Sequence, residues 1–189
     1  MTTISHKYKF AYMRSIKVAG TSTEVLLDNL HDKNDKQLVQ SNKNKLGIRS
    51  HSGPQQIKNV LGDKKFEEYF KFMTVRNPFD RVVSWYWWRE GSWNKPPLSF
   101  KEYIFKEKCK GLLPFYDWMF LNGMCVIDDV IRFENLYDDT KRILNKWVSL
   151  DDFDYPKRKS SSRKSKKHYT EYYDTYTKKF IQEKYKKDI

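Results

Sequence analysis

The amino-acid sequence predicts an α/β fold built around a central, mostly parallel sheet. Three apolar-rich runs, at residues 8–13, 69–75 and 126–136, have the length and composition of buried strands, and helical segments follow them. Strands that alternate with helices are typical of a parallel sheet with helices packed on it. The length of 189 residues predicts a single domain, residues 1–189, that can bury a substantial core.

The first helix is marked by its start. Residues 14–20 form a turn rich in small residues, and a helix is expected from Thr21 to about Leu30. Thr21 and Glu24 have the spacing of a capping box, in which each side chain bonds to the backbone of the other residue. The polar run 31–50 that follows predicts a loop or a poorly marked element.

Prolines mark the next two helix starts. Pro54 suits the first turn of a helix that can extend through 64–70. Asn77 suits the N-cap of a helix that has Pro78 at its first position and runs to about Arg89. The sequence also predicts helices at 99–108, 113–123, 137–148 and from Asp174 to Lys187, a loop at 91–97, and a basic, serine-rich loop at about 155–168.

The charge balance favours an anionic partner. The chain carries 37 Lys and Arg against 24 Asp and Glu, a net charge of +13. Such a charge favours nucleic acid, a membrane surface, or a phosphorylated or sulfated ligand. Because 16% of the residues are aromatic, the chain is expected to fold although 32% are charged.

No metal site, secretory leader or membrane span is predicted. The four histidines and two cysteines lack metal-ligand spacing, and Cys109 and Cys125 are expected to stay reduced. The N-terminal MTTISHKYKF has no apolar region of the signal-peptide kind, and no apolar run approaches the ~20 residues needed to span a bilayer. A cytoplasmic location is therefore expected.

The segment SIKVAGTSTEVLL (15–27) has the features of an anion site. A strand, a small-residue turn and a helix start bring several backbone N–H groups to the positive end of a helix dipole. A nucleotide phosphate loop of the form GxxxxGK[ST] has its lysine after the glycine, whereas Lys17 precedes Gly20. An ordinary tight turn with a solvated Lys17 fits this segment equally well.

A second segment, RNPFDRVVS (76–84), favours the anion site. Arg76 lies at the carboxyl end of a predicted strand, where ligands bind in open α/β sheets. Arg81 and Ser84 are three residues apart on the next helix and share a face, so an arginine and a hydroxyl form a second phosphate clamp. Two clamps at one sheet edge suggest one ligand with two separated anionic groups. The alternative is that both arginines are surface or ion-pair residues.

These two segments resemble the sulfotransferases. IKVAGTS (16–22) is similar to their 5'-phosphosulfate loop, although Ile16 replaces the usual proline, and RNPFDRVVS matches every fixed position of their 3'-phosphate motif, RxPxxRxxS. The likeness continues through RSHSGPQQIKNVLG, VIRFENLYDD and the closing HYTEYYDTYTKKFIQEKYKKDI, in family order. It is strongest for the carbohydrate-type branch, sulfotransferase family 2, and its bacterial relatives.

The resemblance implies a fold, a donor and a site. The fold would be three-layered and similar to the P-loop NTPases. The donor would be 3'-phosphoadenosine 5'-phosphosulfate (PAPS), and a sulfuryl group would pass without a metal to an acceptor hydroxyl, with a carbohydrate as the first expectation and tyrosine or a small metabolite left open. Lys17 would stabilise the oxygen that leaves sulfur. The 5'-phosphate would lie on Ala19, Gly20, Thr21 and Ser22, and the 3'-phosphate on Arg76 and Ser84.

Other residues extend this site. His51, in RSHSGP, is the leading candidate for the base because histidine titrates near neutral pH, and the alternative is a loop histidine that faces water. Arg163 and Lys167, in the basic loop, are candidates to contact the 3'-phosphate or adenine. In WYWW (85–88), Trp87 or Trp88 is a candidate to line an acceptor cleft, although helix packing is the commoner role of such a run.

Two other functions remain open at this point. A nucleic-acid-binding module would explain the charge of +13 and the basic loop, but not two clamps at two strand–helix junctions. A P-loop kinase would have a similar sheet, but it would need Mg²⁺ and a lysine after the loop glycine. The sequence has no obvious acidic magnesium site. Glu134, in RFENL, is expected to order the turn between strand and helix.

Overall fold

The structure is a computed structural model that describes residues 2–28, 30, 51–92, 98–149, 165 and 167–189. It confirms the predicted α/β fold with a mostly parallel sheet. Strands β2 (Phe10–Met13), β3 (Phe70–Val75) and β6 (Asp129–Arg132) are parallel, and the strand order is β1-β2-β3-β6. The edge strand β1 (Thr3–Ser5) is antiparallel to β2 and was not predicted, because three residues are too few to show a pattern.

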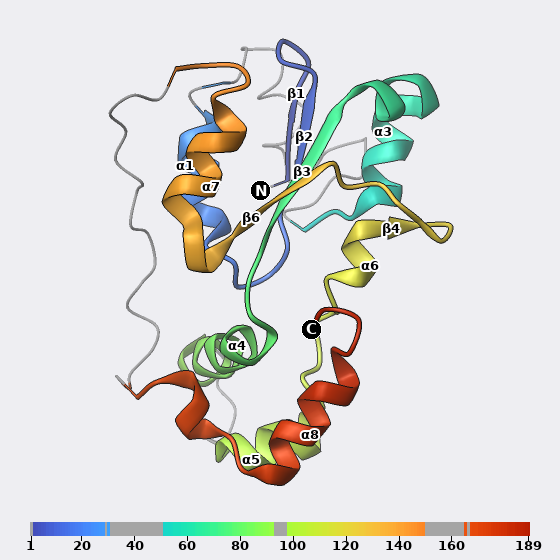
Figure 1. The fold of residues 1–189 in the computed structure, drawn as a ribbon. Helices are drawn as coiled ribbons and strands as arrows, with labels where there is room; N and C mark the ends of the chain where they lie inside the picture. The colour runs from blue at the N-terminus through green and yellow to red at the C-terminus, as the bar shows by residue number, and fades with distance from the viewer. Residues whose placement is uncertain (1, 29, 31–50, 93–97, 150–164, 166) are drawn as a thin grey trace.

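Side-chain alternation along β2 separates two layers of core. Phe10 and Tyr12 pack with helices α1 (Gly20–Asp28) and α7 (Leu136–Leu144), whereas Ala11 and Met13 pack with α3 (Pro54–Glu68) and α6 (Tyr116–Met119). Figure 1 shows α1 and α7 on one side of the sheet and α3 on the other. All four β2 side chains are fully buried, so both faces of this strand are covered by helices.

A third core lies beyond the carboxyl edge of the parallel strands. It joins helix α4 (Pro78–Ser92) to four further helical segments, and Figure 1 shows them together below the sheet. α4 begins as predicted: the Asn77 side-chain oxygen accepts from the Phe79 N–H at 2.9 Å, and Pro78 occupies the first position. The remaining segments are α5 (Phe100–Glu102), the π-helical η1 (Tyr103–Glu107), the 3₁₀ segment η4 (Tyr169–Tyr172) and α8 (Thr175–Lys184).

Several predicted boundaries were wrong. The helix expected at 113–123 is only α6, and a hairpin of β4 (Phe120–Leu121) and β5 (Met124–Cys125) follows it. The strand expected at 126–136 is only β6, followed by the 3₁₀ turn η2 (Phe133–Asn135). The loops predicted at 31–50, 91–97 and about 155–168 lie wholly or mostly outside the described residues, and α4 continues to Ser92.

Two expectations concern the chain as a whole. Cys109 is buried, Cys125 is exposed, and both are free thiols. Within the described residues, no helix has the length and apolar character needed to cross a membrane.

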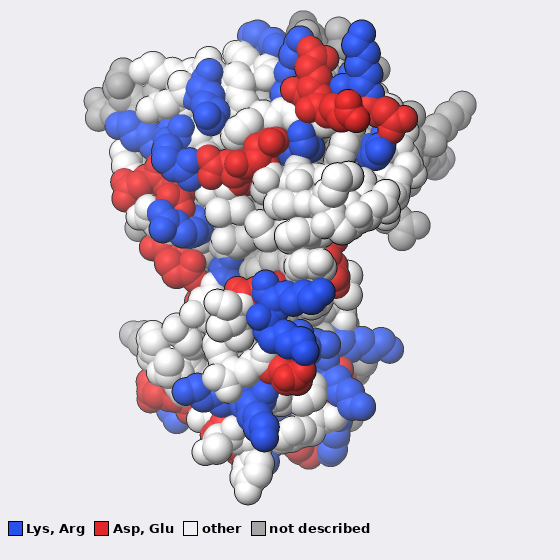
Figure 2. Space-filling view, turned by 45° about the vertical axis from the view of Figure 1, so that its right-hand side comes forward, with Lys and Arg blue, Asp and Glu red and all other residues white. Residues whose placement is uncertain are grey.

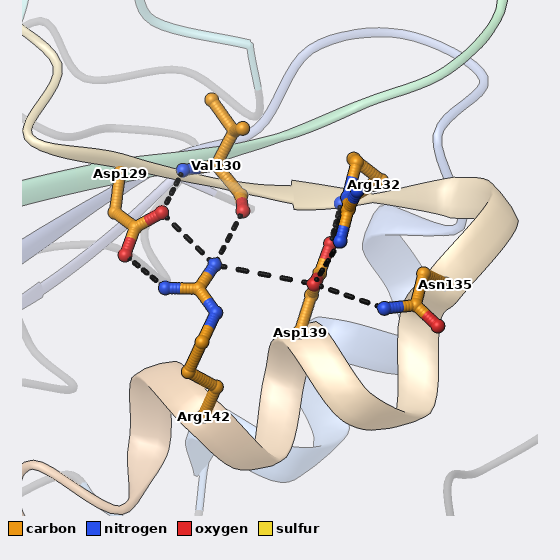
Figure 3. A network of polar contacts seen from close by, with 6 residues as sticks. All are labelled: Asp129, Val130, Arg132, Asn135, Asp139 and Arg142. Atoms are coloured by element: carbon orange, nitrogen blue, oxygen red, sulfur yellow. Dashed lines mark hydrogen bonds and ion pairs between the residues drawn. The ribbon is translucent and has the colours of Figure 1, made fainter.

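A polar network fixes α7 against β6 (Figure 3). The buried Asp139 carboxylate accepts from the backbone N–H of Arg132 at 2.9 Å, from its Nε at 2.7 Å and from its Nη2 at 2.8 Å. Asn135 donates to the same carboxylate at 3.1 Å, and Arg142 forms a second ion pair with Asp129. Hydrogen bonds from Arg132 are the main cause that holds the pKa of Asp139 well below its usual range.

We expect Asp139→Ala to destabilise the fold by about 2 kcal/mol, because it leaves the Arg132 backbone N–H and the Asn135 amide without their acceptor. Thermal unfolding should show this as a fall of roughly 4–8 °C in Tm. Because folding lowers the pKa of Asp139, its contribution is full at neutral pH and is lost as the pH falls below about 4. Asp138→Ala, which removes the exposed neighbouring carboxylate, is the control and should cost less than about 1 kcal/mol. Equal losses for the two variants would contradict this account of the network.

Candidate functional site

The loop between β2 and α1 has an unusual backbone. Lys17 and Ala19 have φ angles of 64° and 58°, in the left-handed region that non-glycine residues rarely adopt. Val18, between them, is fully buried in the core layer beneath α3, so it anchors the loop to the sheet. Backbone strain of this kind is characteristic of functional sites. A turn of this shape, leading into a helix, directs successive N–H groups toward one point and makes an anion-binding concavity.

Helix α1 begins at Gly20, one residue before its predicted start. The Ser22 and Thr23 N–H groups both donate to the Ala19 carbonyl, at 2.8 and 3.3 Å. Gly20 is needed for packing, because a Cβ there would lie 2.6–2.9 Å from three side-chain atoms of Arg14. Thr21 is half-buried and Ser22 is buried, and both lie in the first turn of α1.

Arg14 is a site residue that the sequence did not reveal. Its Nη1 donates to Glu24 at 2.8 Å and its Nη2 donates to the Thr21 hydroxyl at 2.9 Å, so it lies across the first turn of α1. The predicted capping box between Thr21 and Glu24 was therefore wrong. Thr21 lies inside the helix, and the side chains of Thr21 and Glu24 both accept hydrogen bonds from Arg14. The sequence offered one signal for this contact: Glu24 lies about one turn into the helix, and Arg14 precedes that helix.

Arg76 connects the two predicted clamps. It follows β3, and its Nε and Nη2 donate to one Asp80 oxygen at 2.9 and 2.7 Å. Its Nη1 donates to the backbone carbonyl of Lys17 at 3.1 Å. The guanidinium carbon lies 3.8 Å from the centre of the Phe133 ring, which covers one of its faces. The structure thus brings Arg76 and the Lys17 loop into direct contact.

Arg81 does not belong to an exposed clamp. It is 1% exposed, it stacks on the Phe115 ring at 3.9 Å, and burial lowers its pKa to about 10. Its Nε donates to the carbonyl of Ile16 and its Nη1 to that of Leu113, both at 2.9 Å. The expectation that Arg81 and Ser84 together face a phosphate was therefore wrong for Arg81, because its donors are directed into the protein. Ser84 is half-buried on the same helix.

His51 lies beside the same loop. Its Nδ1 is 3.1 Å from the Arg14 carbonyl, and a carbonyl can only accept, so Nδ1 carries the proton and Nε2 has the free lone pair. Desolvation is the main cause that lowers the pKa of His51 below its usual value, although the residue is exposed. The neutral ring with a basic Nε2 is therefore the form present at neutral pH.

A cavity of about 480 Å³ opens at the carboxyl ends of β3 and β6. Arg76, Asn77 and Glu134 line it together with apolar side chains such as Phe79 and Val130. Glu134 accepts from the Asn77 backbone N–H at 2.7 Å, so it ties the two strand–helix junctions together, in keeping with the ordering role expected of it. The cavity is amphipathic and adjoins the arginine that contacts the loop.

Other predicted site residues lie apart from this group or outside the description. Arg163 is outside the described residues, and Lys167 is exposed just before η4. The Trp87 indole donates to the Tyr172 hydroxyl at 3.0 Å, and Trp88 stacks on Trp85 at 4.6 Å. Both half-buried tryptophans pack in the helical core, which is the commoner role for such a run. No group of three potential metal-ligating side chains was found among the described residues.

Positive side chains gather on the helical part of the molecule that lies beyond this edge of the sheet. Figure 2 shows Lys and Arg side chains gathered over the lower, helical part of the molecule, whereas the largest groups of acidic side chains lie on the upper part. A positive surface raises the local concentration of anions and speeds their encounter. Exposed lysines of the described helical part include Lys101, Lys106, Lys108, Lys110, Lys167, Lys178, Lys179, Lys186 and Lys187.

The fold is that of an α/β protein in which a strained loop leads into the N-terminus of α1, and two arginines of the β3–α4 unit bind the carbonyls of this loop. The model of the sulfotransferase family matches residues 1–189, and the chain belongs to this family. Its membership supports a sulfuryl transfer function.

Sequence comparison also finds a relative. A protein of Archaeoglobus fulgidus that is described only as uncharacterized is 30% identical over 92 residues, which are 48% of this chain and 77% of the relative. No solved structure matches the chain.

Proposed function

We propose that the protein transfers a sulfuryl group from PAPS to an acceptor hydroxyl, within a three-layer arrangement similar to that of the P-loop NTPases. The observation that carries this proposal is the contact between Arg76 and the Lys17 carbonyl. It places an arginine at the end of β3 next to an anion loop at the end of β2, as a donor with two anionic groups requires. Membership of the sulfotransferase family implies the same donor.

The loop residues fit the 5' end of such a donor. The N–H groups from Ala19 to Ser22 lie at the start of α1, where an anion is favoured by the helix dipole. The Thr21 hydroxyl already accepts from Arg14, so its own proton can be donated to a phosphate oxygen. Ser22 has the same chemistry, but it is buried and would depend on a close approach of the ligand.

Arg76 and Ser84 are proposed to hold the 3'-phosphate. An arginine–phosphate hydrogen bond is charge-assisted and is stronger than a neutral one. Arg163 and Lys167 are proposed to add positive charge at the same end of the nucleotide. The donor itself supplies a sulfur that accepts the incoming oxygen while its bond to the phosphate oxygen breaks, and adenosine 3',5'-bisphosphate leaves.

Lys17 and His51 supply the charge and the proton acceptor. Negative charge grows on the oxygen that leaves sulfur, and the Lys17 ammonium is proposed to stabilise it. The acceptor hydroxyl loses its proton to Nε2 of His51 as the new S–O bond forms. The hydrogen bond between Nδ1 of His51 and the Arg14 carbonyl fixes the ring for this step. A carbohydrate hydroxyl is the proposed acceptor, by resemblance to the carbohydrate-type branch.

Nucleotide binding tests the donor assignment. We expect adenosine 3',5'-bisphosphate to bind ~10- to 100-fold more tightly than AMP in calorimetry, because charged hydrogen bonds hold the 3'-phosphate. Ser84→Ala should reduce this preference, whereas Lys178→Ala, on the exposed face of α8, should preserve it. Transfer from labelled PAPS to a panel of carbohydrate, tyrosine and small-metabolite acceptors tests the reaction. Tight binding of duplex DNA with no affinity for either nucleotide would contradict the proposal.

A further inference from the structure

Two consecutive carbonyls of the β2–α1 loop are each held by an arginine from the next strand–helix unit. Arg81 donates from Nε to the Ile16 carbonyl at 2.9 Å, and Arg76 donates from Nη1 to the Lys17 carbonyl at 3.1 Å. Lys17 is one of the two left-handed residues of this loop. These hydrogen bonds therefore stabilise the left-handed backbone conformation at Lys17, which is costly for a residue other than glycine.

Arg81 is placed to support the loop rather than to bind a ligand. At 1% exposure, its guanidinium contacts two backbone carbonyls and the face of Phe115. Arg89, further along the same helix and 3% exposed, is neutralised by Glu107 and Glu90 instead. A buried guanidinium is costly. Because Arg81 donates to the carbonyls of Ile16 and Leu113, we infer that its role is to hold these two carbonyls in place.

Contacts outside the loop also hold the Arg76 side chain in place. Asp80 holds its Nε and Nη2, and Phe133 covers one face of the guanidinium. Only 11% of its side chain and 14% of that of Asp80 are exposed. A side chain held on one edge and one face has little freedom, so the position of Nη1 determines the position of the Lys17 carbonyl.

We propose that Arg76 and Arg81 are positioning residues that hold the 14–19 loop in the shape that aims Lys17. This inference rests on the proposed function. Arg76 then acts twice, on the 3'-phosphate and on the backbone of the residue that stabilises the leaving oxygen. Arg81 acts on the loop alone. The consequence is that losing Arg76 impairs the loop even when no 3'-phosphate is present.

A donor that lacks the 3'-phosphate separates the two roles of Arg76. With adenosine 5'-phosphosulfate, we expect Arg76→Ala to lower kcat by ~10- to 100-fold relative to the wild type, because one charged hydrogen bond to the loop is lost. Lys178→Ala is the control: it removes one exposed positive charge from α8 and no contact with the loop, so its kcat with this donor should equal that of the wild type. If Arg76→Ala also leaves this kcat unchanged, Arg76 is a phosphate ligand only and the inference is wrong.

Hydrogen exchange in the unliganded protein gives an independent reading. We expect the amides of residues 17–22 to exchange ~10- to 100-fold faster in Arg76→Ala and in Arg81→Lys, which keeps the charge but loses the planar fork. The amides of β3 should exchange as in the wild type, which shows that the variants are folded. Unchanged exchange at 17–22 in both variants would overturn the inference. A wild type that transfers from neither donor would contradict the proposed function, but the exchange comparison would still decide the role of the arginines.

Discussion

Replacing Lys17 by alanine is expected to lower kcat for sulfuryl transfer by about 100- to 1000-fold, while donor affinity changes much less. Lys17 lies in the strained loop between β2 and α1, and its carbonyl is fixed by Arg76. The backbone groups proposed to hold the 5'-phosphate remain in the variant. The ammonium is proposed to act mainly on charge that develops in the transition state, so its loss is expected to appear in kcat rather than in binding. Single-turnover kinetics with labelled PAPS measures this directly.

Lys178→Ala is the charge-matched control for Lys17→Ala. It removes one lysine from the exposed face of α8, and its kcat should stay within about twofold of the wild type. If Lys17→Ala raised KM and left kcat intact, Lys17 would contribute only uniform binding to the donor. That result would remove it from the chemistry and leave the anion loop as a binding element.

Replacing His51 by glutamine is expected to lower kcat by about 100-fold or more, the usual effect of losing a general base. Desolvation lowers the pKa of His51, so the neutral, basic form is favoured. Activity of the wild type should therefore be full at neutral pH and should fall as the pH drops through a value below about 6.5. His51→Gln should lose this acid limb. A pH profile of kcat/KM for both proteins makes the comparison.

His6→Gln is the control for the histidine substitution. His6 lies in the turn after β1, where its Nδ1 is 2.6 Å from the Tyr69 hydroxyl, and it has no proposed part in transfer. It should keep both the rate and the acid limb of the wild type. An acid limb that persists in His51→Gln would assign the titration to another group and exclude His51 as the base.

Local sequence patterns predicted those parts of the fold that local forces determine. The cap at Asn77 and Pro78 is such a case, because one side chain and one ring fix the helix start. The strands β2 and β3 are another, because their apolar residues need cover on both faces. β1 was missed because pairing with β2, and not its own three residues, defines it.

The contacts of the site could not be predicted in the same way. Thr21 and Glu24 have the spacing of a capping box. Arg14, however, packs closely against Gly20 of α1, and its guanidinium donates hydrogen bonds to both of these side chains. Arg81 matches an exposed clamp by spacing, but the helical core and Phe115 bury it. In each case a residue outside the local motif supplies the stronger partner, and only the folded structure brings the two together.

A crystal structure with adenosine 3',5'-bisphosphate tests the central claim most directly. The claim is that the β2–α1 loop and the β3–α4 junction hold the two ends of one nucleotide. The expected result is the 5'-phosphate on the N–H groups of residues 19–22 and the 3'-phosphate within hydrogen-bond distance of Arg76 and Ser84. A nucleotide bound elsewhere, or bound with only one phosphate at these elements, would contradict the account.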